Sequence, residues 1–247
     1  MDDKSLEGGI WSGIFLGVDV LVFCDNEGCI VEGKGAPFDL PAMMELAKMI
    51  KASSLEFSIC TGRPVPYIEA ITQMLHLLDS KTEFVCEAGA VLYDPQTDHY
   101  EVLSDRVDVT TIRSLLPPAG YREELGKIAS YSVYPESPYT VERLYELLIS
   151  AGLSGVNLTR SVAAVDITAA GVDKAFGIEV ILERRGMDWT GVLAIGDSWN
   201  DLPMLRLAGR SACPANATWE VKAVVDYVSP YPATAGVVDI LRWAGAA

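Results

Sequence analysis

Residues 18–28 read VDVLVFCDNEG, an almost unbroken apolar run that ends in a polar turn. The run is rich in β-branched side chains, which is typical of a strand buried on both faces of a parallel sheet. Asp25 and Glu27 follow it directly, and Gly28 lets the chain curl there. Ligands bind at the carboxyl ends of strands in open α/β sheets. The segment therefore predicts a central strand with two carboxylates at its ligand-binding end.

Strand-length apolar segments alternate with segments of helical period on both sides of this stretch. Such alternation predicts an α/β fold, a Rossmann-like parallel sheet core with helices on both faces. Asp39 and Pro41 are suitable residues to start the first helix. Residues 84–94 are expected to be extended and broken at a glycine. The predicted strands are 18–24, 55–60, 191–197 and 211–214, and the predicted helices are 42–53, one with Ile68, Ile71, Leu75 and Leu78 on one face, 174–186, 201–209, 217–228 and 235–245.

The pattern changes character in residues 95–165. This part has its own apolar faces, which predicts a small α+β domain inserted into a core made of 1–94 and 166–247. Its predicted helices are 110–116 and 138–152, and its predicted strands are 128–135 and 155–168.

The charge balance limits the partners of this chain. Its 247 residues include 34 acidic and 19 basic side chains, a formal net charge of −15. Such a surface repels nucleic-acid phosphates and anionic lipids, so we expect neither as a partner. An anionic substrate would need a local positive site, so basic residues near Gly-rich segments are of particular interest. Composition does not decide between a monomer and a homodimer.

The cysteines and the N-terminus bear on the compartment. Five cysteines without CxxC spacing indicate buried thiols in a reducing compartment. The chain begins with acidic residues where a signal peptide would be basic. The apolar stretch 10–24 is interrupted by Asp19 and is short for a membrane span. The sequence thus predicts a cytoplasmic protein.

Three further segments place polar residues at strand ends or helix starts. Thr61 and Gly62 could hold phosphate oxygens at a helix N-terminus, or Thr61 could be an ordinary N-cap. Lys174 follows a glycine at a helix start and is either a phosphate ligand or a solvated charge. Asp197 and Asp201 suit a hard-cation site, although an N-cap with a surface acid has the same spacing.

Taken in order, these segments resemble the motifs of the haloacid dehalogenase-like phosphatase superfamily. DNEG (25–28) is similar to its D-x-D-G-T motif, CTG (60–62) to its hydrophobic-S/T-G motif, Lys174 to its lysine, and GDSWND (196–201) to its acidic motif. The second Asp of the first motif is Glu27 here, and its Thr is Cys29. Glu27 keeps a protonatable carboxyl group with a longer reach, whereas Cys29 is a poor substitute for a hydroxyl.

The resemblance implies a magnesium-dependent phosphomonoester hydrolase with an inserted α/β cap. Asp25 would be the nucleophile that forms an aspartyl-phosphate, and Glu27 the general acid and base. The implied Mg²⁺ ligands are Asp25, the Glu27 carbonyl and Asp197, with Asp201 supporting or ligating. The implied phosphate-binding residues are Thr61, Gly62, Lys174 and Asn200.

Residues 213–232 and 87–94 look like the branch that holds archaeal-type phosphoglycolate phosphatases and sucrose-phosphatase-like enzymes. A small phosphorylated metabolite, with phosphoglycolate first, is therefore the expected substrate. Lys127 and Tyr131 in the cap are candidates for contacting its distal group, or else a surface lysine and a buried tyrosine. The alternatives are a sugar-phosphate phosphatase of the sucrose-phosphate or mannosyl-phosphoglycerate type, a phosphomutase, or a non-catalytic protein that binds phosphorylated metabolites.

Overall fold

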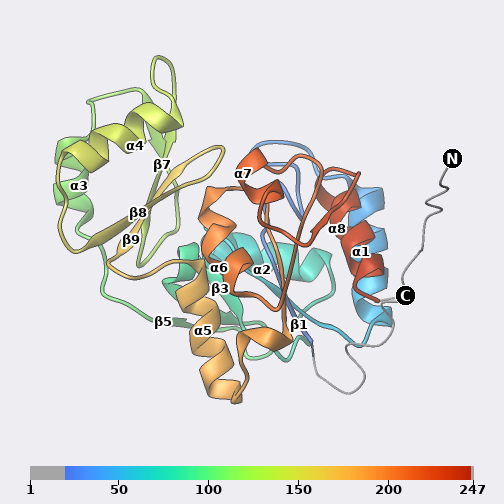
Figure 1. Ribbon diagram of the computed structural model, residues 1–247. Helices are drawn as coiled ribbons and strands as arrows, with labels where there is room; N and C mark the ends of the chain where they lie inside the picture. Colours follow the sequence, from blue (N-terminus) through green and yellow to red (C-terminus); the bar gives the residue numbers. More distant parts are fainter. Residues whose placement is uncertain (1–19, 246–247) are drawn as a thin grey trace, which may run out of the picture.

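The computed structural model describes residues 20–245, and Figure 1 shows their arrangement. A five-stranded parallel sheet in the order β12-β11-β10-β1-β2 forms the core. The predicted central strand is β1, with β10 and β2 on either side. Residues 18 and 19 of the predicted strand lie outside the described part. The strands are β1 Leu21–Cys24, β2 Glu56–Ile59, β10 Val192–Ile195, β11 Arg210–Cys213 and β12 Tyr227–Val228.

The side chains of β1 alternate between two apolar layers. Val22 and Cys24 pack in the layer that includes α1 (Leu40–Ala52) and α8 (Ala233–Trp243). Leu21 and Phe23 pack in the opposite layer, with α5 (Lys174–Arg185) and α6 (Leu202–Leu207). All four β1 side chains are fully buried. The predicted parallel sheet with helices on both faces is therefore confirmed.

The predicted helix starts and faces are mostly confirmed. Asp39 caps α1 by accepting a hydrogen bond from the Ala42 N–H at 3.1 Å. Ile68 and Ile71 are buried in α2 (Val65–Met74). Leu78 was expected on the same face but is 50% exposed, because α2 ends at Met74 and His76, at a φ of 56°, turns the chain.

The predicted helix 217–228 is correct only in its first part. It is limited to the single turn α7 (Trp219–Lys222), after which the chain extends into β12. Pairing of β12 with β11 at the sheet edge outweighs the helical period of this segment.

Residues 84–102 form a three-stranded antiparallel sheet beside β2. Its strands are β3 Phe84–Cys86, β4 Val91–Asp94 and β5 His99–Val102. A bridge between Cys60 and Val85 joins it to the core sheet. Between β3 and β4 lies the tight turn η1 (Glu87–Gly89), in which all three residues have positive φ.

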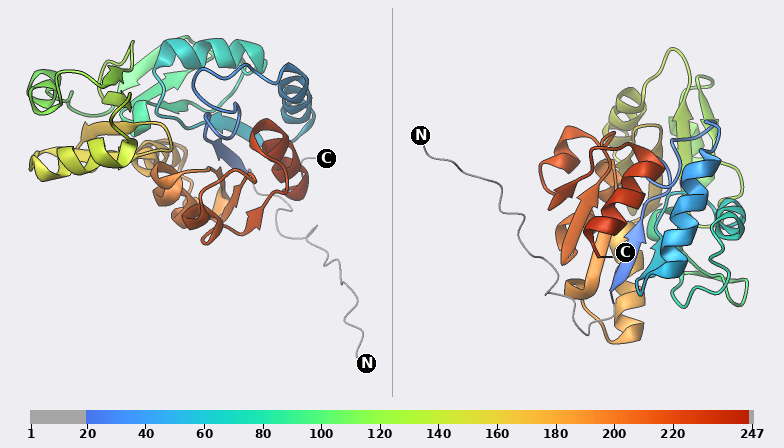
Figure 2. Two further views of the ribbon diagram at one scale, coloured as in Figure 1. Left: turned by 90° about the horizontal axis from the view of Figure 1, so that it is seen from above. Right: turned by 90° about the vertical axis from the view of Figure 1, so that its right-hand side faces the viewer.

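The inserted unit is a four-stranded antiparallel sheet in the order β6-β7-β9-β8. Two helices pack on one face through an apolar cluster that includes Ile112, Leu144 and Ile167. Figures 1 and 2 show this unit beside the core. We call it the cap. Its elements are α3 Val109–Leu115, β6 Tyr121–Glu123, β7 Tyr131–Pro135, α4 Val141–Ser150, β8 Val156–Arg160 and β9 Val165–Ala169.

Pairing of the strands bears on the domain boundaries. β5 pairs with β4, and β9 pairs with β7 and β8, so the predicted single strand 155–168 is in fact the hairpin β8–β9. The predicted insertion of 95–165 stays a prediction. The pairing supports an insertion that lies between β5 and α5.

Candidate active site

Three loops meet at the carboxyl ends of adjacent parallel strands. Asp25 follows β1, Thr61 comes two residues after β2, and Asp197 comes two residues after β10. The Asp25 N–H donates to the Ile195 carbonyl at 2.8 Å, and the Cys60 N–H donates to the Cys24 carbonyl at 2.8 Å. These bonds extend the ladders beyond the strands. They fix the side chains that follow at one edge of the sheet.

Lys174 lies at the centre of this edge. Its Nζ is 2.7 Å from Asp25 Oδ1 and 2.6 Å from Asp201 Oδ1, and the residue is only 1% exposed. Asp173 caps α5 by accepting from the Phe176 N–H at 3.0 Å, which sets Lys174 in the first turn. A solvated surface charge is therefore not its role.

Asp201 organises the loop that carries Asp197. Its Oδ2 accepts hydrogen bonds from the N–H groups of Asp197 and Ser198, each at 3.0 Å. Carboxylate oxygens of Asp25, Asp197 and Asp201 lie within 4.8 Å of one another, and all three residues are buried. A set of hard oxygen donors of this kind fits Mg²⁺. Both oxygens of Asp201 have partners, so this carboxylate orients Lys174 and the loop of Asp197, and a metal contact by Asp201 stays a prediction.

Burial and mutual repulsion control the ionisation of these acids. Burial, followed by the charge of Asp201, raises the pKa of Asp25 to about 8, with Lys174 acting against the rise. The same causes raise the pKa of Asp197 well above its ordinary value. Burial would lower the pKa of Lys174, but the charges of Asp201 and Asp25 raise it. One ammonium does not balance three carboxylates, so the cluster favours an added cation.

Gly28 is required by a close approach as well as by its backbone. Its φ is +81°, and a Cβ on it would lie 2.2 Å from Asp197 Oδ2. Its carbonyl accepts from Asn216 Nδ2 at 2.9 Å. The turn that carries Asp25 can therefore lie directly against the loop of Asp197 only if residue 28 lacks a side chain.

The predicted phosphate cradle is only partly exposed to the site. Gly62 lines the cavity described below, whereas Thr61 is fully buried. The Thr61 hydroxyl accepts from the Arg63 N–H at 3.1 Å, and its carbonyl accepts from the Ala88 N–H at 2.9 Å. Thr61 is not the N-cap of α2, because Pro64 holds that position. A phosphate contact by Thr61 stays a prediction.

Glu27 is linked to the cap through Arg63. Glu27 Oε1 lies 3.3 Å from Arg63 Nε. The same guanidinium donates from one nitrogen to both oxygens of Glu124, which follows β6, at 3.0 and 3.1 Å. Burial raises the pKa of Glu27, and the charge of Arg63 acts against this. A raised pKa suits a carboxyl group that has to donate a proton near neutral pH.

A cavity of about 280 Å³ lies between these loops and the cap. It brings together several of the predicted site residues, and it adds others that sequence reasoning did not single out. The core contributes Asp25, Glu27, Gly28, Glu32, Gly33, Lys34, Gly62, Asp197, Ser198, Asn200 and Asn216, and the cap contributes Tyr134, Ser161, Val162, Ala163, Ala164 and Asp166.

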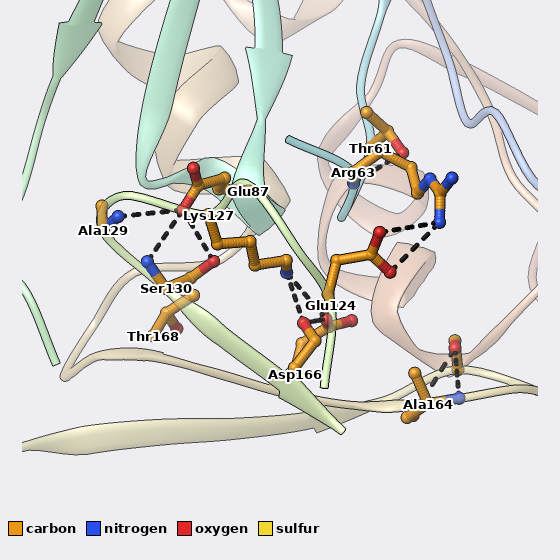
Figure 3. A network of polar contacts seen from close by, with 12 residues as sticks. Thr61, Arg63, Glu87, Glu124, Lys127, Ala129, Ser130, Ala164, Asp166 and Thr168 are labelled. Atoms are coloured by element: carbon orange, nitrogen blue, oxygen red, sulfur yellow. Dashed lines mark hydrogen bonds and ion pairs between the residues drawn. The ribbon is translucent and has the colours of Figure 1, made fainter. Parts of the chain in front are cut away.

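The two predicted specificity residues of the cap do not line this cavity. Figure 3 shows Lys127 pointing toward Asp166, with Nζ 3.3 Å from Oδ1, and it also donates to the Ser132 hydroxyl. Its side chain is 4% exposed. Tyr131 is buried in the apolar cluster under the cap helices, on the face of the sheet turned away from the site. A substrate contact by either residue stays a prediction.

The residues that sequence reasoning did not single out carry different signals. Arg63 belongs to the same segment as Thr61 and Gly62, and Lys34 lies in the Gly-rich stretch after Asp25 and Glu27. Both are basic residues of the kind that an anionic substrate would need in an acidic chain. Glu124 and Asp166 carry no such signal, since their importance depends on how the cap sits on the core.

The sequence of this chain is similar to known phosphatases of one family. A family model described as haloacid dehalogenase-like hydrolase matches residues 121–241. The chain is 36% identical over 234 residues to a phosphoglycolate phosphatase from Methanopyrus kandleri, covering 90% of this chain and 95% of the relative.

Among solved structures, the fold is similar to that of a Thermoplasma acidophilum protein, with a TM-score of 0.76 and 24% identity over 93% of this chain and all of the other. A sucrose-phosphatase from Synechocystis, solved with sucrose and phosphate, has a TM-score of 0.69 and 16% identity over 92% of this chain and 98% of its own. Within residues 20–245, none of the helices has the length and apolar character needed to cross a bilayer.

Proposed function

We propose that this chain, which belongs to the haloacid dehalogenase-like hydrolases and is a phosphatase, uses Mg²⁺ and the Asp25 carboxylate to hydrolyse a small phosphomonoester. The observation that carries the proposal is the buried cluster of Asp25, Asp197 and Asp201 around Lys174. A nucleophile, a fixed ammonium and a set of hard-cation ligands at one sheet edge are what phosphoryl transfer requires.

The residues divide the reaction into two steps. An Asp25 carboxylate oxygen attacks phosphorus as the ester oxygen departs, and Glu27 gives that oxygen its proton. Water then attacks the aspartyl-phosphate while Glu27 takes up a proton, which releases phosphate and regenerates Asp25. Lys174 supplies positive charge beside Asp25. Gly62 and Asn200, which both line the cavity, face the phosphate oxygens. Mg²⁺, held by Asp25, Asp197 and the predicted Glu27 carbonyl, would neutralise negative charge on the transferred group.

We infer that phosphoglycolate is the best candidate substrate. The name of the Methanopyrus kandleri relative supports a small phosphorylated acid, and the cavity of about 280 Å³ suits a small ester. The second candidate is a sugar phosphate. It is favoured by Tyr134, Ser161 and Asp166, which offer hydroxyl and carboxylate groups to a polyol. We also propose a cytoplasmic location, supported by five buried free thiols.

The replacement Asp25→Asn tests the mechanism. An amide oxygen is a poor nucleophile, so Mg²⁺-dependent phosphate release from phosphoglycolate is expected to fall to the uncatalysed background. Asp105→Asn, at an exposed carboxylate outside the cavity, is the control and should keep wild-type activity. Wild-type turnover by Asp25→Asn with Mg²⁺ present would refute the assignment.

The same assay separates the other candidate functions. A phosphomutase would transfer the phosphoryl group to a second substrate hydroxyl and release little phosphate. A protein that only binds phosphorylated metabolites would be stabilised by the ester against thermal unfolding but would release no phosphate. Sugar phosphates, tested beside phosphoglycolate, decide between the two substrate classes.

A further inference from the structure

The cavity has an uneven distribution of charge. Acidic side chains line it from both sides, with Asp25 and Asp197 at the sheet edge and Asp166 on the cap. Within the described part of the chain, Lys34 is the one basic side chain in its lining. A bound anion other than the phosphate would therefore have one candidate partner among the lining side chains.

Lys34 lies on the side of the cavity next to the cap. Its loop leaves the core after the nucleophile turn, and its Nζ lies 3.5 Å from the centre of the Tyr134 ring. Nζ also forms an ion pair with Glu124. Because both contacts are with cap residues, the ammonium faces the space for the part of the substrate that is not phosphorylated.

Glu124 does not depend on Lys34 to compensate its charge. Arg63 donates to both of its oxygens, at 3.0 and 3.1 Å. The Glu124 side chain is 7% exposed, while that of Lys34 is 26% exposed. Lys34 can therefore turn to a ligand without leaving a buried carboxylate unpaired.

Three other basic residues near the site already have acidic partners. Lys127 pairs with Asp166, and Lys174 pairs with two acids beneath the phosphate position. Arg63 is held between Glu27 and Glu124. None of these side chains lines the cavity.

We propose that Lys34 binds a carboxylate on the far side of the substrate from the phosphate and thereby selects phosphorylated acids over phosphorylated alcohols. This inference rests on the proposed function and names the residue that sets substrate choice at the same site. On binding, the substrate carboxylate takes the place of Glu124 at Nζ, and Glu124 keeps Arg63.

Two esters that differ in one group provide the test. In 2-phosphoglycolate a carboxylate occupies the position that a hydroxymethyl group has in 2-hydroxyethyl phosphate. Lys34→Met is expected to lower kcat/KM for 2-phosphoglycolate by about 10- to 100-fold, mainly by raising KM. A change of this size corresponds to the loss of one hydrogen bond between charged groups. For 2-hydroxyethyl phosphate kcat/KM should stay within about twofold. Lys34→Arg should restore part of the preference, and Lys51→Met, on the exposed side of α1, is the matched control.

Binding to the Asp25→Asn protein gives a readout that does not depend on turnover. Adding Lys34→Met to it should weaken the binding of 2-phosphoglycolate, measured by calorimetry, about tenfold and leave that of 2-hydroxyethyl phosphate unchanged. Equal losses for both esters, or no loss for either, would overturn the assignment of Lys34. Selective loss of binding in the double variant, together with no phosphate release by the chain that keeps Asp25, would support Lys34 and refute the proposed hydrolysis.

Discussion

At the scale of single residues, Lys174 explains how several acids can be buried together. Its ammonium bridges Asp25 and Asp201, while backbone N–H groups satisfy the second oxygen of Asp201. Within residues 20–245 the Asp197 carboxylate gains no comparable partner, and burial together with the charge of Asp201 raises its pKa well above the ordinary value. The three carboxylates carry more negative charge than Lys174 neutralises. The stability of the cluster therefore depends both on pH and on bound cations.

A pH dependence of stability follows from Asp25. Its pKa rises from the ordinary 3.8 to about 8 in the folded protein without metal. The folded state therefore keeps a proton that the unfolded state has lost, so the stabilisation is fully present below the unfolded pKa and is lost as the pH rises through about 8. Asparagine does not titrate. We expect Asp25→Asn to gain free energy of unfolding relative to wild type as the pH rises from 5 to 8.

Urea unfolding in a chelating buffer at several pH values measures this difference. A difference that stays flat or shrinks as the pH rises would contradict the prediction. Repeating the series with Mg²⁺ is the control, because a bound cation favours the ionised carboxylate and should weaken the dependence.

The candidate site could be predicted in part at this scale. Asp25, Lys174, Asp197 and Asp201 lie together because each follows a strand or starts a helix, and such positions can be read along the sequence. The pairing of Arg63 with Glu124 could not be read in that way. It joins residues that are 61 positions apart and depends on where the cap packs.

At the scale of elements, the turn η1 joins the core to the cap. Glu87 is fully buried, and Figure 3 shows its carboxylate facing the segment before β7. It accepts from the N–H groups of Ile128, Ala129 and Ser130 at 2.8, 3.0 and 2.8 Å, and from the Ser130 hydroxyl at 3.0 Å. The neighbouring Ala88 N–H donates to Thr61. One turn therefore contacts both the cap and the loop that carries Thr61.

Replacing Glu87 by glutamine should loosen this junction. The carboxylate accepts hydrogen bonds with both oxygens, whereas an amide has one oxygen and one NH₂ group. The NH₂ group would face backbone N–H donors, and these buried donors would lose their acceptor. We expect Glu87→Gln to lower the free energy of unfolding by about 2–3 kcal/mol, measured by urea unfolding. Ser130→Ala removes one hydroxyl bond and should cost about 1 kcal/mol. Equal, small losses in both variants would show that the carboxylate is not needed there.

Two strands that could not be predicted, β6 and β12, both lie at an edge of their sheet. β6 has three residues, Tyr121–Glu123, with little apolar pattern, because it lies at an edge of the cap sheet and is only partly buried. The residues of β12 belong to a segment with a helical period, but in the structure they pair with β11. The buried strand β1 and the capped helix α1 were predictable, because the apolar run and the capping residue that specify them lie within or next to each element.

At the scale of the whole molecule, the cap contacts the core on two sides of the cavity. On one side Glu124 meets Arg63 and Lys34. On the other, the Arg160 guanidinium at the end of β8 lies 4.5 Å from the centre of a Trp199 ring, beside the loop of Asp197. We expect at least one of these contacts to open when the substrate enters.

Arg160→Ala should therefore shift the cap toward open states. Loss of a cation–π contact of about 0.5–2 kcal/mol should speed amide hydrogen exchange in residues 161–164 and lower kcat/KM severalfold. Arg143→Ala is the matched control, because its side chain is exposed on α4 and pairs with Glu146 on the same helix. Unchanged exchange at 161–164 in Arg160→Ala would mean that this contact does not hold the cap.

Both ends of the inserted unit meet the core at η1. Leu103 donates to the Ala90 carbonyl as the chain leaves. Where the chain returns to the core, Asp173 packs against Gly89. A Cβ on Gly89 would lie 1.8 Å from the carbonyl oxygen of Asp173. The two chain connections of the cap therefore lie next to each other, beside one turn of the core. We expect that a change in the segment between β5 and α5 leaves Asp25 and Asp201 in place, because their partners Lys174 and the Asp197 and Ser198 N–H groups all belong to the core. Such a change could alter which metabolite is bound while the groups beside Lys174 stay the same.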